Sequence, residues 1–286
     1  MLKNILQVNL AMIFVSTSGF FGRYIDVPTP LTIGMRACIA AVALLLFCWI
    51  KGFKLKVAKA DKAMVLFSGF LMWLHWITYF YALQKSNVAI GMLTLFTYPV
   101  LTALLEPMVL KTAFSKFHLL LGAMVLVGLY FIVPEFSLES DYFIAILLGL
   151  FSALVYALRN IIVKSRIGSY NGSVIMLYQL VVASVLAIPF FFTLELKSIT
   201  EFIPSLLALG LITTALGHTL FLYSFRHFST TTVSILSCTQ PLFGILIGML
   251  LLKEFPRTGT WIGGAIILGT IVAESIRLQK QAQKLR

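Results

Sequence analysis

Apolar residues run along the chain in stretches of about twenty, separated by short clusters of charged residues, prolines and polar residues. An α-helix of that length crosses the roughly 30 Å hydrocarbon core of a bilayer. Backbone groups in lipid must bond within their own segment, and these runs lack the alternation of barrel strands, so we expect helices. The predicted segments are 4–22, 29–50, 63–83, 88–110, 116–133, 142–163, 171–194, 201–222, 230–251 and 258–277. The pattern predicts an all-α membrane protein with ten transmembrane helices.

The composition excludes an ordinary soluble protein. Of the 286 residues, 60% are hydrophobic and 11% are charged, whereas soluble domains are about 25% charged. A net charge of +12 would suggest nucleic acid in a soluble chain, but here the basic residues gather in short loops. The three cysteines show no metal-type spacing. We therefore expect a lipid bilayer as the environment, no nucleic-acid partner, no metal and no cofactor.

The basic residues also orient the chain. With a cytoplasmic N-terminus, most of them fall on the cytoplasmic side: Lys3, Lys51, Lys54, Lys56, Lys59, Lys62, Lys111, Lys116, Lys164, Arg166, Arg226, Arg277, Lys280, Lys284 and Arg286. This asymmetry matches the positive-inside rule. It predicts a multi-pass protein of the plasma (inner) membrane with both termini in the cytoplasm.

The two halves of the chain are similar. A shift of 142 residues without a gap superimposes six pairs: Tyr81 and Tyr223, Thr97 and Thr239, Pro99 and Pro241, Leu110 and Leu252, Lys111 and Lys253, Gly122 and Gly264. A shift of 136 residues relates Ser16 to Ser152 and Arg23 to Arg159. The alternative is that apolar sequences align by chance, but matching prolines and glycines are harder to produce that way than matching leucines.

Five segments in each half return the chain to the opposite face, so the second copy must be inverted relative to the first. We expect two five-helix repeats, 1–137 and 138–286. Inverted repeats are typical of secondary transporters, which hold the substrate near the midplane between the halves.

The second half resembles the EamA half-repeat of the drug/metabolite transporter superfamily. The stretch Gly210–Glu274 has an aromatic-rich span, a short basic loop, a span with a central proline, a glutamate and a glycine-rich final span. In the first half, YFYALQKSNVAIGMLTLFTYPV resembles the same pattern, as do Pro30, Arg36, Ala40 and Ala41. Thr112 departs from it, because it stands where the second half has Glu254. The resemblance implies ten helices in two inverted bundles and the export or exchange of small metabolites.

Pro99 and Pro241 lie inside apolar segments, where a missing backbone donor should break the helix. Irregular backbone at membrane depth is tolerated where it is buried in protein or lines a wet cavity. One interpretation places the breaks beside the substrate site, together with Tyr98 and Gln240. The other is that the prolines only shape packing.

The third segment contains MWLHWITYFYAL, which places His75, Trp76 and Tyr79 deep in the membrane. An aromatic cavity with one histidine would bind amphipathic solutes by stacking and cation–π attraction. Interhelical packing is the alternative.

His218 is the repeat equivalent of Trp76, and histidine titrates in the physiological range, so His75 and His218 are candidate proton sites. A neutral His218 bonded to a neighbouring helix is the alternative. Glu106 is a third proton candidate, or a gate or packing residue.

Arg36 is an intramembrane guanidinium that needs partners. It could hold a substrate carboxylate or phosphate, or its head group could snorkel to the membrane surface. Arg159 lies near the cytoplasmic end of its segment, and we expect it to snorkel.

The predicted function is a secondary transporter that exports or exchanges small organic metabolites such as amino acids by alternating access. The alternatives are an importer or exchanger of nucleosides, quaternary amines or sugar phosphates, and a non-transporting membrane scaffold. The sequence has neither a nucleotide-binding GxxxxGK[ST] motif nor an HExxH or GxSxG constellation, so we expect neither ATP drive by this chain nor an enzyme. The small residues Gly244 and Gly248 predict a close helix contact, either within the chain or in a homodimer.

Overall fold

A computed structural model describes residues 2–111, 117–132, 140–165, 169–192, 199–228, 230–237 and 239–284. Within these ranges every regular element is helical. The predicted boundary between residues 137 and 138, and Thr112, lie outside the described residues.

In the described part of the first half the helices are α1 (Leu2–Tyr24), α2 (Thr29–Ile50), α3 (Lys59–Lys85), α4 (Val88–Leu95), α5 (Tyr98–Leu110) and α6 (Phe117–Ile132). The second half begins with α7 (Asp141–Lys164) and α8 (Gly172–Phe191). The short turn η2 (Thr200–Phe202) leads into a continuous stretch of α10 (Ile203–Ala208), the π-helix η3 (Leu209–His218) and α11 (Thr219–Ser224). The last elements are α12 (Thr230–Leu236), α13 (Thr239–Ile247), the π-helix η4 (Gly248–Leu252) and α14 (Thr258–Lys284).

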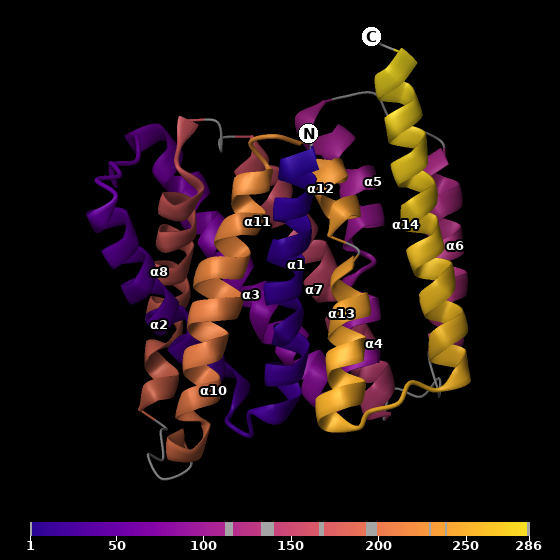
Figure 1. The fold of residues 1–286 in the computed structure, drawn as a ribbon, viewed down its shortest axis with the longest axis horizontal. Helices are drawn as coiled ribbons and strands as arrows, with labels where there is room; N and C mark the ends of the chain where they lie inside the picture. Colours follow the sequence, from indigo (N-terminus) through magenta and orange to yellow (C-terminus); the bar gives the residue numbers. More distant parts are fainter. Residues whose placement is uncertain are drawn as a thin grey trace.

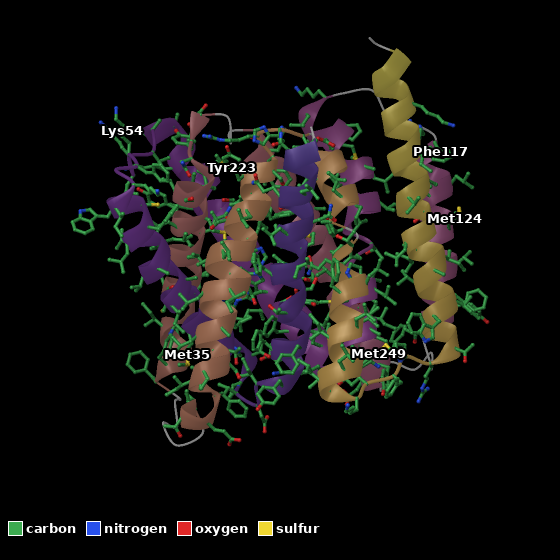
Figure 2. All side chains as sticks on the ribbon, viewed as in Figure 1. Met35, Lys54, Phe117, Met124, Tyr223 and Met249 are labelled. Atoms are coloured by element: carbon green, nitrogen blue, oxygen red, sulfur yellow. The ribbon has the colours of Figure 1, made fainter. Side chains whose placement is uncertain are left out.

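The helices stand side by side and run alternately up and down, so that α1 begins at the end of the bundle where α14 finishes (Figure 1). Among the residues that the structure describes, six helical stretches are long and apolar enough to cross a membrane: 29–50, 59–85, 88–110, 141–164, 172–191 and 200–224. Apolar side chains project outward over the flanks of the bundle, as Met124 does from α6 (Figure 2). An extended apolar surface of this kind is typical of a face that contacts lipid.

Helices from the two halves pack on each other as the repeat predicts. α2 packs on its equivalent α8, and α6 packs on its equivalent α14. The contact of α3 with α7 has its equivalent in the contact of η3 with α1. The shift of 142 residues also carries α4 and α5 onto α12 and α13. Lys111 ends α5 and Lys253 ends η4, and both adopt left-handed backbone, with φ of 55° and 58°. The two repeats therefore share the same unusual turn as well as similar sequence.

Each central proline follows a break in its helix. α4 ends at Leu95 and α5 begins at Tyr98, so Pro99 lies in the first turn of α5. α12 ends at Leu236 and α13 begins at Thr239, which gives Pro241 the equivalent place. A proline is accepted in a first turn because its missing N–H would have no helical acceptor there.

Gly244 of α13 and Gly248 of η4 pack closely against α4 of the same chain. A Cβ on Gly244 would collide with Met92 of α4, and one on Gly248 would press on Val88. Gly244 and Gly248 are therefore occupied by internal packing. A homodimer stays a prediction, and it would need another surface.

Candidate functional site

A small cavity lies inside the bundle, where the two halves meet. The space open to the centre of a water molecule is about 10 Å³, which is room for one water. Its walls come from α1, α2, α3, α7, η3, α13 and the segment around the α4–α5 break. The lining residues are Val15, Ser18, Arg36, His75, Trp76, Tyr79, Leu95, Phe96, Tyr156, His218 and Gln240.

Arg36 supplies a positive charge to this cavity from α2. Its side chain is fully buried, so it does not snorkel to the surface. Nε donates to Oγ1 of Thr214 at 3.0 Å, and Cζ lies 4.1 Å from the centroid of the Trp76 ring. Nη1 and Nη2 have no acceptor among the described residues. Cation–π attraction therefore holds the guanidinium in place and leaves its two terminal nitrogens available to an anion.

His75 is fixed by a two-way contact with Ser152 of α7. The Ser152 hydroxyl donates to the carbonyl oxygen of His75 at 2.9 Å, and its oxygen lies 2.7 Å from Nδ1 of the ring. Because the hydroxyl has one hydrogen, Nδ1 must be the donor to Ser152 in a neutral ring. This assigns an acceptor role to Nε2, the other ring nitrogen.

The His75 ring belongs to an aromatic column across the site. It stacks on Tyr156 at a centroid distance of 4.3 Å and lies 6.0 Å from Tyr79, with interplanar angles of 21° and 10°. Tyr156 in turn faces Phe221 at 6.0 Å. These rings offer flat apolar surface beside the charge of Arg36.

Trp76 and His218 occupy equivalent positions in the two repeats, and they touch. Their rings meet edge to face at 5.4 Å. Nδ1 of His218 has no partner among the described residues. Equivalent residues can contact each other only near the axis that relates the repeats, so this pair marks that axis.

Arg159 of α7 is a second buried guanidinium. The expectation that it would snorkel was wrong, because its side chain is completely buried. Nη1 donates to Oδ1 of Asn160 at 2.9 Å, and Nη2 donates to Oε1 of Gln179 on α8. Sequence reasoning gave Arg159 no role in a site and missed Tyr156, one turn before it. The match of Arg159 to Arg23 in the repeat was the available signal.

The other predicted residues are placed as follows. Gln240 lines the cavity, and its carbonyl oxygen accepts from Ser16 at 3.0 Å. Tyr98 lies one layer behind, with its ring 5.0 Å from Tyr156 and its hydroxyl bonded to that of Ser237 at the α12–α13 break. Pro99 and Pro241 are buried in the first turns that follow the two breaks.

Glu106 is not part of the cavity lining. It attracts Lys164, whose ammonium donates to the carbonyl oxygens of Phe225 and Phe228 at 2.6 and 2.8 Å. Glu106 therefore acts near the end of the bundle where α7 finishes. A proton role for Glu106 stays a prediction.

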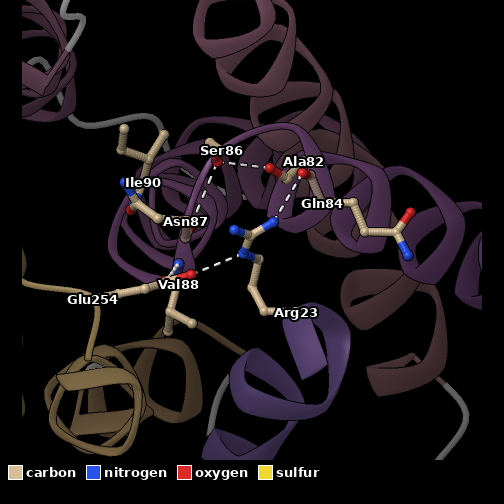
Figure 3. A network of polar contacts seen from close by, with 8 residues as sticks. All are labelled: Arg23, Ala82, Gln84, Ser86, Asn87, Val88, Ile90 and Glu254. Atoms are coloured by element: carbon tan, nitrogen blue, oxygen red, sulfur yellow. Dashed lines mark hydrogen bonds and ion pairs between the residues drawn. The ribbon is translucent and has the colours of Figure 1, made fainter. Parts of the chain in front are cut away.

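One end of the bundle is tied across the repeats by Arg23 of α1 and Glu254, which follows η4 (Figure 3). Nε of Arg23 lies 2.8 Å from Oε1 of Glu254, and Nη1 donates to the carbonyl oxygen of Gln84 at 3.1 Å. The other carboxylate oxygen accepts the backbone N–H of Val88, at the start of α4, at 2.9 Å. The carboxylate thus joins both halves at the positive end of a helix dipole.

The interior is electropositive. Among the described residues the fully buried charged side chains are Arg36 and Arg159, and no carboxylate is buried with them. A buried charge without a counterion is destabilised by several kcal/mol. The buried charges therefore favour an anionic group as a ligand.

The EamA-like transporter family matches residues 2–133 and again residues 143–274. The chain belongs to this family. It is 25% identical to the pseudopaline exporter CntI of Pseudomonas aeruginosa over 81% of each chain. It is also 25% identical to an uncharacterized transporter of Archaeoglobus fulgidus, over 92% of this chain and 93% of that one. A solved crystal structure shares the fold over 98% of each chain, with a TM-score of 0.73 at 15% identity.

The family and the apolar helices make this chain a multi-pass membrane protein of a transporter family. The resemblance drawn from the sequence is confirmed. The match of two successive segments to one family also identifies the chain as a two-repeat protein.

Proposed function

We propose that this EamA-family protein is a secondary transporter that exports or exchanges small organic metabolites bearing a carboxylate, with amino acids as the leading class. The observation that carries the proposal is the buried guanidinium of Arg36, whose terminal nitrogens have no acceptor among the described residues. Trp76, Tyr79, Tyr156 and His75 supply the surface for the rest of the solute. Gln240 adds a polar contact.

Transport proceeds by alternating access. The cavity holds only about one water molecule, so a metabolite enters when the two repeats separate at one end. The tie of Arg23 to Glu254 keeps one end closed, and it must break once in every cycle. The relative named as an exporter supports export over import.

We further propose ten transmembrane helices in two inverted repeats, 1–137 and 138–286. Equivalent helix breaks and equivalent left-handed turns support this division. Lys54 lies at the end of the bundle where α1 begins and α14 finishes, and Arg23 lies at the other end (Figure 2). The positive-inside rule then gives a plasma-membrane protein with both termini in the cytoplasm and Arg23 on the outer side.

Coupling to protons, if present, involves His75 or His218 in preference to Glu106. Both histidines line the cavity and contact aromatic neighbours there. Either one could exchange a proton while the solute occupies the same space. We propose no catalytic role, in keeping with relatives that are named as transporters.

The test measures thermal stabilisation of the purified protein by three matched probes: phenylalanine, phenylalanine amide and phenethylamine. A ligand at about 100 times its Kd stabilises by about 2.7 kcal/mol. We expect stabilisation by the acid but not by the amide or the amine, and loss of the difference in Arg36→Gln. Equal stabilisation by all three, or an acid effect that survives Arg36→Gln, would overturn carboxylate recognition.

The same assay with uridine, choline and glucose 6-phosphate tests the alternative substrate classes. Proteoliposomes loaded with the stabilising solute then separate a carrier from a scaffold. Saturable counterflow identifies a carrier, and no flux identifies a scaffold.

A further inference from the structure

The second guanidinium, Arg159, lies at the other end of the aromatic column from Arg36. Arg36 acts electrostatically on Tyr79, and Arg159 acts on Tyr156. Between these two tyrosines stands His75, at ring distances of 6.0 and 4.3 Å, and both arginines act on it. Arg159 does not itself line the cavity, but it lies one turn along α7 from Tyr156, which does, so the column separates two buried positive charges.

The partners of Arg159 accept hydrogen bonds from its guanidinium but carry no negative charge that would neutralise it. Asn160 and Gln179 offer neutral amide oxygens, and Gln179 is itself held by a 2.8 Å bond from Nε2 to the hydroxyl of Ser68. Nε of Arg159 has no acceptor among the described residues, while the Asn160 amide interacts with the Tyr156 hydroxyl. One donor on a completely buried guanidinium is thus left for an acceptor from elsewhere.

A purely structural role would not need a charge here. Asn160 and Gln179 could be joined by a neutral side chain, and a buried cation without a counterion destabilises the fold. An anion that arrives with the solute would remove this penalty while it is bound. Two like charges at the two ends of one column would be compensated together by two anionic groups on one extended molecule.

We propose that Arg159 is a second anion-recognition residue, and that the transported solutes carry two carboxylates separated by a spacer, one bound at Arg36 and the other at Arg159. This inference rests on the proposed function, in which Arg36 binds a carboxylate. The spacer lies along the faces of Tyr79, His75 and Tyr156. The rings between the arginines are spaced by 6.0 and 4.3 Å, so a diacid whose carboxylates share one carbon is too short to bind at both ends.

The test compares dicarboxylates with monocarboxylates of matched length in purified protein. The probes are malonate, glutarate and pimelate, each measured against the monocarboxylate of the same chain length by thermal shift and by calorimetry. We expect glutarate or pimelate to bind at least about tenfold more tightly than its partner, and malonate to show no such preference. Equal affinity throughout the series would overturn the proposal.

Variants then assign the preference to a residue. Arg159→Gln should weaken the preferred dicarboxylate by about tenfold to a hundredfold and leave the monocarboxylate within about twofold. Arg36→Gln should weaken both. Lys85→Gln is the matched control, because it removes an exposed cation outside the cavity and should change neither. Equal effects of Arg159→Gln on both acids would overturn the assignment.

Arg159→Lys keeps the proposal testable if Arg159→Gln does not fold. It retains the charge but not the planar fork, so the dicarboxylate preference should fall by a smaller factor while monocarboxylate binding persists. If Arg159→Lys kept the whole preference for the dicarboxylate over the monocarboxylate, a directional hydrogen bond from the Arg159 guanidinium would be refuted. Failure of the proposed function would look different, because neither acid would then bind to the unmodified protein.

Discussion

Breaking the tie between Arg23 and Glu254 should open one end of the transporter. The perturbation is Glu254→Gln, which keeps the shape of the side chain and an acceptor for the N–H of Val88 but removes the charge facing Arg23. The companions are Arg23→Gln and the double variant, which together complete a double-mutant cycle.

The magnitude follows from the geometry. Unit charges about 4 Å apart attract by about 4 kcal/mol at an effective dielectric constant of about 20. Desolvation and side-chain ordering offset most of this, and exposed pairs contribute only about 0.2–1 kcal/mol. The side chains here are 34% and 20% exposed, and Glu254 also accepts from Val88. We therefore expect about 1–2 kcal/mol, or a five- to thirtyfold change in the ratio of closed to open states.

The assay is the rate at which an impermeant thiol reagent labels Ser18→Cys from the Arg23 side. Ser18 lines the cavity and is small, so the cysteine fits, and the native cysteines are replaced in the background protein. Lys85→Gln is the control, because its pair with Asp141 is more exposed, at 39% and 65%. That variant should change labelling by less than about twofold.

Unchanged labelling in Glu254→Gln would refute the role of this pair in closure. An equal increase in Lys85→Gln would also refute it, since the effect would then come from net charge at that end. A coupling energy near zero in the cycle would show that Arg23 and Glu254 act separately.

Three further predictions address the cavity, the packing and the third proton candidate. Trp76→Ala should reduce the free energy of solute binding by more than it reduces the free energy of unfolding, with truncations of other buried aromatic residues as the reference. Equal losses in the two free energies would assign Trp76 to packing alone. Gly149→Ala should destabilise the fold by about 1–3 kcal/mol in a denaturation assay, because the added Cβ collides with Thr94. Gly269→Ala, which meets open space in the same helical context, should be neutral or stabilising by up to about 1 kcal/mol. Glu106→Gln should leave the pH profile of transport unchanged, because Glu106 lies outside the cavity lining, and a shifted profile would restore its proton role.

The helices were the most predictable part of the protein. The segment predicted at 29–50 coincides with α2 residue for residue, and the segment at 88–110 contains α4 and α5. Length decides these cases, since a span must cover the hydrocarbon with its own hydrogen bonds. Proline then marks the breaks, because it removes one backbone donor at a known place.

The inward face of each helix was much less predictable. In water a helix reveals its buried side by contrast with its polar side, but lipid-facing and core-facing positions here are both apolar. Sequence position along α7 therefore placed Arg159 near a membrane surface, and only its packing against Gln179 shows that it points inward. Tyr98 illustrates the same limit, because Phe96 reaches the cavity from the break while Tyr98 turns toward Ser237.

The contact between Trp76 and His218 has a consequence for the pose of the solute. In a fully symmetric pair of inverted repeats, a molecule on the axis could bind equally well in either of two reversed orientations. An indole on one side and an imidazole on the other make these orientations unequal in energy. The solute should then bind in the same orientation in every transport cycle. Sequence divergence between the repeats would thus turn a site with two equivalent binding orientations into a site with one preferred orientation.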